Sequence, residues 1–136
     1  MTYLALLIGG VAGGVLRYAL DTILPTPHSF PLSTLVINLI GSFILGLFYG
    51  VADVREVKPW LQVGFGTGVI GAFTTFSTFC LDMTTLTSSS LGLAAIYVTS
   101  SILGGPFLAF FGDQIVVAAL RRTVKDSVQD IEELSV

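Results

Sequence analysis

Residues 64–79 read Gly-Phe-Gly-Thr-Gly-Val-Ile-Gly-Ala-Phe-Thr-Thr-Phe-Ser-Thr-Phe, and they lie inside an uncharged segment that runs from Pro59 to Cys80. This segment reaches the ~20 residues that a helix needs to cross a bilayer. It is rich in Gly, Thr and Ser, however, which is unlike a plain lipid-facing anchor. Non-helical backbone at membrane depth is tolerated only where protein or a watery cavity covers it. The stretch therefore predicts a broken membrane helix that turns carbonyls, hydroxyls and ring edges toward an ion.

The composition of the whole chain is typical of an integral membrane protein. The 136 residues are 53% hydrophobic and 11% charged, whereas soluble domains carry roughly 25% charged residues. The mean hydropathy is +0.88. The single cysteine excludes an internal disulfide and an all-cysteine metal site. We therefore predict an all-α membrane protein in which residues 1–120 form one four-helix domain and residues 121–136 form a polar, solvated tail.

Four apolar segments approach the spanning length. They run from Tyr3 to Leu20, from Leu32 to Ala52, from Pro59 to Asp82, and from Leu91 to Phe111 with room for the helix to continue to Leu120. A polar turn rich in Ser and Thr is expected at Thr84 to Ser90. In the first segment the pairs Gly9/Gly13 and Gly10/Gly14 recur at helical spacing, which predicts close helix–helix contact.

Polar side chains inside these segments are the candidate functional residues. Thr34 and Asn38 are four apart and share a helical face, as do Tyr97 and Ser101. An amide in an apolar field is costly unless it is satisfied. Two interpretations of Asn38 stay open: an interhelical hydrogen bond, or a donor that faces a pore. Arg17, near the end of its segment, either snorkels to the interface or pairs inside the protein.

The cationic residues predict an orientation. With four spans, both termini and the middle loop share one side of the membrane. That side carries five of the six cationic residues, and only Arg17 lies near the other; the five are Arg55, Lys58, Arg121, Arg122 and Lys125. The positive-inside rule therefore places both termini in the cytoplasm.

The residue types argue against enzymatic chemistry and for ion binding. The apolar segments contain no His, no Glu and no central Asp, so no general base or proton relay is expected, and Asp82 and Asp113 lie near segment ends. Neutral N–H and O–H donors and the positive edges of Phe rings favour an anion that must also be released. Carbonyls freed near Gly71 and Thr74 would suit a small hard cation. The row Phe73, Phe76 and Phe79, taken alone, is typical of core packing.

Three motifs together resemble the CrcB/Fluc family of fluoride channels. The most specific is Gly71-Ala72-Phe73-Thr74-Thr75-Phe76-Ser77-Thr78-Phe79. The others are Gly13-Gly14-x-x-Arg17-Tyr18 and Thr34-Leu35-x-x-Asn38-x-x-Gly41-Ser42-Phe43. The resemblance covers residues 4–112, in the order and spacing of the family.

This resemblance implies a fold and a function. The family forms antiparallel, dual-topology dimers with two pores in a prokaryotic cell membrane, and it exports toxic cytoplasmic fluoride passively, which gives fluoride resistance. The third helix breaks at the membrane centre, where carbonyls of both subunits hold a structural sodium ion on the dimer axis. The matching carbonyls here are those of Gly71 and Thr74. The lipid bilayer, fluoride and a second subunit are thus the expected partners, and no nucleic acid is expected.

The resemblance also implies individual roles. Phe76 and Phe79 match the pore phenylalanines and Asn38 matches the pore amide, which overturns the packing interpretation for the two rings. Arg17 matches an arginine with a structural role, and Phe73 stays a packing residue. The polar track is matched by Ser77, Thr78, Thr34, Tyr97 and Ser101.

Three questions stay open on the sequence alone. Homodimeric members tend to have balanced Lys and Arg, so the bias in this chain leaves homodimer and paired heterodimer as alternatives. A small multidrug resistance-type proton-coupled exporter would share the length and topology, but it should carry a membrane-embedded Glu in its first helix. A non-transporting membrane scaffold would use the Gly-rich faces for assembly alone.

Overall fold

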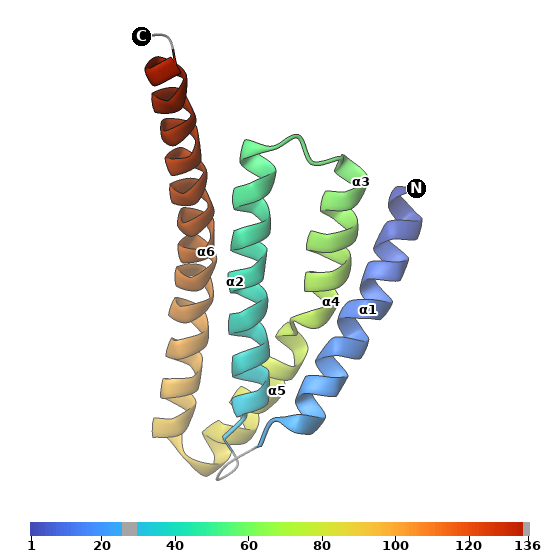
Figure 1. The fold of residues 1–136 in the computed structure, drawn as a ribbon. Helices are drawn as coiled ribbons and strands as arrows, with labels where there is room; N and C mark the ends of the chain where they lie inside the picture. Colours follow the sequence, from blue (N-terminus) through green and yellow to red (C-terminus); the bar gives the residue numbers. More distant parts are fainter. Residues whose placement is uncertain (26–29, 135–136) are drawn as a thin grey trace.

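The computed structural model describes residues 1–25 and 30–134, with side chains as far as Leu120 (Figure 1). The described residues form helices joined by short connections: α1 (Thr2–Ile23), α2 (Leu32–Val54), α3 (Pro59–Gln62), the π-helix η2 (Val63–Ile70), α4 (Gly71–Phe73), α5 (Phe76–Ser89) and α6 (Leu91–Leu134). Within the described part of the chain, four spans are long and apolar enough to cross a membrane: Thr2–Ile23, Leu32–Val54, Pro59–Ser89 and Leu91–Leu120. The predicted all-α, four-span architecture is confirmed, and the chain is a multi-pass membrane protein.

The two chain ends lie at the same end of the bundle. Figure 1 shows the start of α1, the connection between α2 and α3, and the C-terminal part of α6 at one end, whereas the α5–α6 turn lies at the other. Arg55 and Lys58 belong to the α2–α3 connection. The shared side that the sequence predicts for the termini and the middle loop is therefore present in the fold.

Glycines let α1 approach the third span closely. A Cβ on Gly9 would overlap the carbonyl oxygen of Gly64, and a Cβ on Gly13 would overlap that of Val69. The predicted close contact is thus confirmed for this pair of glycines. A Cβ on Gly10 or on Gly14 would meet nothing within 4 Å, so the second pair faces away from the packed side of α1.

The other tight contact joins α2 to α6. A Cβ on Gly46 would overlap the carbonyl of Ala109, and a Cβ on Gly112 would lie 2.6 Å from the carbonyl oxygen of Phe43. Small residues at such positions allow helix backbones to approach in a membrane, where no hydrophobic force drives the helices together. The bundle consequently consists of two close pairs, α1 with the third span and α2 with α6.

The structure corrects the sequence analysis in two places. The polar turn expected at Thr84 to Ser90 is wrong, because α5 continues to Ser89. Its hydroxyls donate to carbonyls three or four residues earlier, as Thr84 and Thr85 both do to Leu81 at 2.7 and 3.0 Å, so they stay satisfied within the helix.

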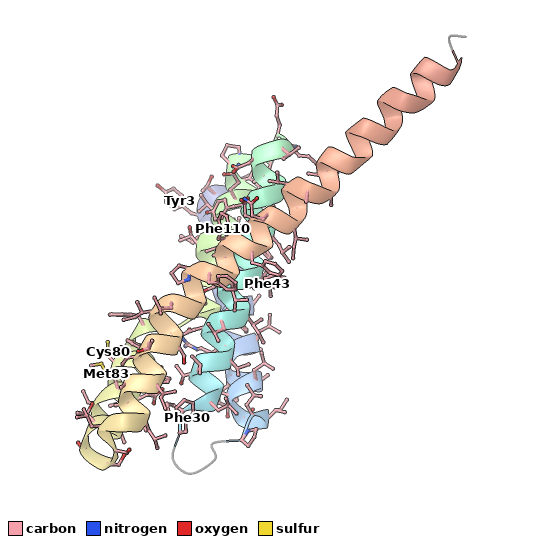
Figure 2. All side chains as sticks on the ribbon, turned by 90° about the vertical axis from the view of Figure 1, so that its left-hand side faces the viewer. Tyr3, Phe30, Phe43, Cys80, Met83 and Phe110 are labelled. Carbon is pink, nitrogen blue, oxygen red and sulfur yellow. The ribbon has the colours of Figure 1, made fainter. Side chains whose placement is uncertain are left out.

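The second correction concerns the fourth span. The expected helix reaches Leu120 at most, whereas α6 runs to Leu134, through Pro106, and projects beyond the other helices (Figures 1 and 2). The side chains of residues 121–136, and with them the predicted solvation of the tail, lie outside the described residues.

Candidate functional site

The third span contains two extended residues between helices. Helix α4 ends at Phe73, and Thr74 has φ −78° and ψ 157°. Thr75 has φ −145° and ψ 122°, and its side chain accepts a hydrogen bond from the N–H of Thr78, which makes it the N-cap of α5. A helix interrupted in this way leaves backbone groups without intrahelical partners, and other atoms must satisfy them.

Asn38 satisfies the backbone of Thr75 from the neighbouring helix. Its Nδ2 donates to the Thr75 carbonyl at 3.0 Å, and its Oδ1 accepts from the Thr75 N–H at 2.8 Å. Of the two interpretations that the sequence left open, the interhelical hydrogen bond is therefore present. An amide nitrogen carries two N–H groups, so one donor of Asn38 is left for another partner.

Asn38 also lines an open cavity of about 330 Å³ between α2, the third span and α6. Phe76, Phe79 and Ser101, which the sequence predicts as pathway residues, line it too. Among the residues that the structure describes, no charged side chain belongs to this lining, which otherwise consists of Leu39, Ser42, Leu45, Ile70, Thr74, Thr75, Ile102 and Gly105. The cavity thus combines aromatic rings, hydroxyls and an amide, which are groups that can surround an anion without a fixed countercharge.

Four aromatic rings follow one another through this region. The centroids of Phe76 and Phe79 are 5.8 Å apart, and those of Phe79 and Tyr97 are 5.3 Å apart, with interplanar angles of 28° in both pairs. Phe30, near the end of the bundle in Figure 2, meets Tyr97 edge-on at 5.8 Å. Tyr97 is fully buried, whereas Phe76 is 78% exposed. The row therefore runs from the buried ring of Tyr97 to the ring of Phe76, which the described part of the chain leaves largely exposed.

Tyr97 connects the aromatic row to polar residues on two other helices. Its hydroxyl donates to Oδ2 of Asp82 at 3.2 Å, and the Thr34 side chain, buried beside it, also interacts with that hydroxyl. Ser101 donates back to the Tyr97 carbonyl at 2.8 Å. The structure thus places Thr34 beside the Tyr97 hydroxyl, whereas Ser101 bonds the backbone of its own helix.

A second cavity, of about 250 Å³, is lined by three further predicted residues. Arg17 lines it together with Thr34 and Thr78, and Asp21 and Thr75 contribute as well. Ser77 lies outside both linings, and its hydroxyl is 3.3 Å from Oγ1 of Thr75. Thr75 belongs to the linings of both cavities and therefore lies between them.

Sequence reasoning missed three residues of this region: Thr75, Asp82 and Phe30. Asp82 follows Phe79 by three residues, a spacing that places it on the same helical face, and this signal could have found it. Thr75 carries only a hydroxyl in a run of hydroxyls, and Phe30 precedes the predicted helix. Neither has a sequence signal that separates it from its neighbours.

The available oxygen ligands near the interruption are neutral. Among the residues that the structure describes, no group of three or more His, Cys, Asp or Glu side chains gathers that could hold a metal ion. Gly71 is exposed and lines a groove of about 650 Å³ with Gly10, Tyr3 and Thr67. The oxygen atoms present at this point are backbone carbonyls, including those of Gly71 and Thr74, and the hydroxyls of Thr74 and Thr75.

Comparison with known proteins gives consistent matches over nearly the whole membrane domain. Residues 4–113 match the family model described as CrcB-like protein, Camphor Resistance (CrcB). A fluoride-specific ion channel FluC 2 of Geobacillus kaustophilus is 38% identical over 116 residues, covering 82% of this chain and 90% of the relative. FluC 2 of Ligilactobacillus salivarius is 41% identical, covering 82% and 81%. FluC of Pyrococcus horikoshii is 37% identical, covering 79% of this chain and 89% of the relative.

Proposed function

The chain belongs to the CrcB family, and on this premise we propose that it is a fluoride-selective channel that lowers cytoplasmic fluoride by passive export. The observation that carries the proposal is the uncharged cavity in which Asn38, Phe76, Phe79 and Ser101 meet. These are the residue types that a strongly hydrated anion needs in place of its lost water. The relatives are ion channels by name, and no enzymatic activity is proposed.

Neutral donors would let fluoride both enter such a cavity and leave it. The spare N–H of Asn38 and nearby hydroxyls can donate to fluoride, while the positive edges of Phe76 and Phe79 add a weaker attraction. A Lys or Arg at the same place would bind the anion too firmly, because conduction requires release as well as entry. Ser77, Thr78, Thr34 and Tyr97 would continue the polar track on either side.

We further propose that two subunits assemble antiparallel, so that each completes a pore of the other. Phe76 is 78% exposed in the single chain, and a pore ring facing lipid could not select an ion. The open side of α1 at Gly10 and Gly14 offers backbone for close approach by a partner, and Gly10 shares a groove with exposed Gly71. The partner is a second copy or a paired, oppositely oriented subunit, as the one-sided Lys and Arg residues suggest.

A sodium ion is proposed on the axis of this dimer, held by the carbonyls of Gly71 and Thr74 from both subunits. The residues fit such an ion, since α4 ends between them and a helix end leaves its last carbonyls unpaired. Hard cations prefer oxygen ligands. The ion would supply positive charge at the centre of the assembly. The membrane is the cell membrane, with both termini cytoplasmic in the orientation that the Lys and Arg residues favour.

Passive export makes a prediction that separates a channel from a proton-coupled exporter. Fluoride efflux from liposomes that contain the purified protein should be slow until valinomycin lets potassium carry the balancing charge, and it should then be rapid. A fluoride electrode records both phases. Efflux that instead depends on an imposed pH gradient, and not on valinomycin, would contradict electrodiffusive export.

The ring of Tyr97 should matter more for fluoride efflux than its hydroxyl. Tyr97→Phe keeps the stack on Phe79 and loses one hydrogen bond to Asp82, so efflux should fall by about 5-fold or less, the equivalent of ~1 kcal/mol. Tyr97→Leu removes the buried ring and should abolish efflux. The rates are compared at equal amounts of dimeric protein. A Phe variant as inactive as the Leu variant would show that the hydroxyl, and not the ring, is the essential group.

A further inference from the structure

Two backbone N–H groups at the interruption of the third span are bound by side chains. In a continuous α-helix the N–H of a residue donates to the carbonyl four residues earlier. Thr75 would then donate to Gly71, and Thr78 would donate to Thr74. Instead the Thr75 N–H donates to Oδ1 of Asn38 at 2.8 Å, and the Thr78 N–H donates to Oγ1 of Thr75 at 3.2 Å. Both carbonyls thus lose the donors that a helix would give them.

The two side chains that take these donors are themselves held in place. Asn38 is fixed by its second hydrogen bond, from Nδ2 to the Thr75 carbonyl at 3.0 Å. The Thr75 hydroxyl lies 3.0 Å from Oγ1 of Thr78 and 3.3 Å from Oγ of Ser77. The extended conformation of Thr75 is therefore stabilised from α2 on one side and from the first turn of α5 on the other.

Thr74 is fixed in the same way, and its own donors point back along the chain. Its N–H and its hydroxyl both donate to the Ile70 carbonyl at 2.9 Å. The Thr74 methyl group lies where a Cβ on Gly41 would have to be, so Thr74 packs directly against the backbone of α2. No donor of Thr74 is thus directed at its own carbonyl or at that of Gly71.

We infer that Asn38 and Thr75 are positioning residues for the cation site, because their side-chain oxygens keep two N–H groups away from the carbonyls of Gly71 and Thr74. The inference rests on the proposed function and deepens it. Asn38 would serve both ions at once, with one edge of its amide lining the fluoride cavity and its oxygen maintaining the sodium ligands. Thr75 also lines the fluoride cavity, and its effect on the cation would be indirect, through the N–H of Thr78.

Thr75 offers a matched pair of variants. Thr75→Val keeps the shape and removes the hydroxyl, so the Thr78 N–H is free to bond the Thr74 carbonyl and close the helix over one ligand. Thr75→Ser keeps the hydroxyl. The readout is the melting temperature of the purified protein in detergent, measured in sodium chloride and in N-methyl-D-glucamine chloride. Wild type and Thr75→Ser should melt higher in sodium, and Thr75→Val should show no such increment, or require at least ten times more sodium to reach it.

A second pair tests the other side chain independently of whether Thr75→Val folds. Asn38→Asp keeps an oxygen for the Thr75 N–H but loses the Nδ2 donor to the Thr75 carbonyl, so it should retain more of the sodium increment than Asn38→Leu even if fluoride efflux is lost. Asn38→Leu removes that oxygen and should lose the increment. Wild-type increments in both Thr75→Val and Asn38→Leu would overturn the inference. An absent increment in wild type would overturn it together with the sodium site, whereas wild-type fluoride efflux, measured in parallel, reports on the channel itself.

Discussion

Replacing Phe76 by isoleucine should reduce fluoride efflux on the order of 100-fold or more, which corresponds to ~2.7 kcal/mol of lost stabilisation along the pathway. Phe76 lines the uncharged cavity and stacks on Phe79 at 5.8 Å. Isoleucine keeps an apolar side chain of useful size but has no ring, and thus no positive edge to face an anion. The barrier to fluoride should rise accordingly.

The fold should survive this change, because the ring contributes little to the packing of its own chain. Phe76 is 78% exposed, and the melting temperature should remain near that of wild type. Phe110→Ile is a matched control: Phe110 lies on α6, is 63% exposed and lines neither cavity (Figure 2). It should conduct normally. Wild-type efflux in Phe76→Ile, or equal loss in both variants, would contradict the assignment of Phe76 to the pore.

The second large effect is expected on stability, from a single methyl group on α1. Gly13→Ala would place a Cβ onto the Val69 carbonyl and 3.1 Å from the Phe73 nitrogen. These are backbone atoms, so no side chain can rotate away, and α1 would have to separate from the third span. Overpacking of this kind costs about 3 kcal/mol at the upper end of its usual range. The yield of monodisperse protein and its melting temperature should both fall.

Gly92→Ala is the control for this prediction. A Cβ there would meet only the Ser90 hydroxyl at 4.0 Å, and alanine favours helix over glycine by up to ~1 kcal/mol. Gly92→Ala should therefore be neutral or slightly stabilising. If Gly13→Ala melts no lower than Gly92→Ala, then α1 does not depend on the close contact with Val69 that its glycine permits.

The parts of the fold that the sequence predicts are those with a local pattern. Long uncharged runs set the four spans, and Gly9 and Gly13 recur at helical spacing, so their close contact could be anticipated. The turn predicted at Thr84 to Ser90 was wrong because it was inferred from the Ser and Thr content alone, whereas α5 continues to Ser89. Hydroxyls that bond back to Leu81 and neighbouring carbonyls make a helix equally acceptable, and only the fold decides between the two.

The candidate site was less predictable because its contacts are distant in sequence. Asn38 and Thr75 are separated by 37 residues, and nothing in either segment specifies that the amide binds that backbone. A hydrogen bond joins Tyr97 on α6 to Asp82 on α5, whereas in the sequence Asp82 is only a carboxylate near a segment end. The residue types predicted the chemistry of the site, but the partners in its hydrogen bonds could be identified only from the fold.

The most direct test of the central proposal is ion-selective efflux from liposomes that contain this chain alone. A fluoride electrode and a chloride electrode record the release of each anion after valinomycin is added. We expect rapid release of fluoride with no release of chloride beyond that of empty liposomes. Equal release of both anions would contradict a fluoride-selective channel. Absence of fluoride release, even after co-reconstitution with an oppositely oriented family member, would contradict transport altogether.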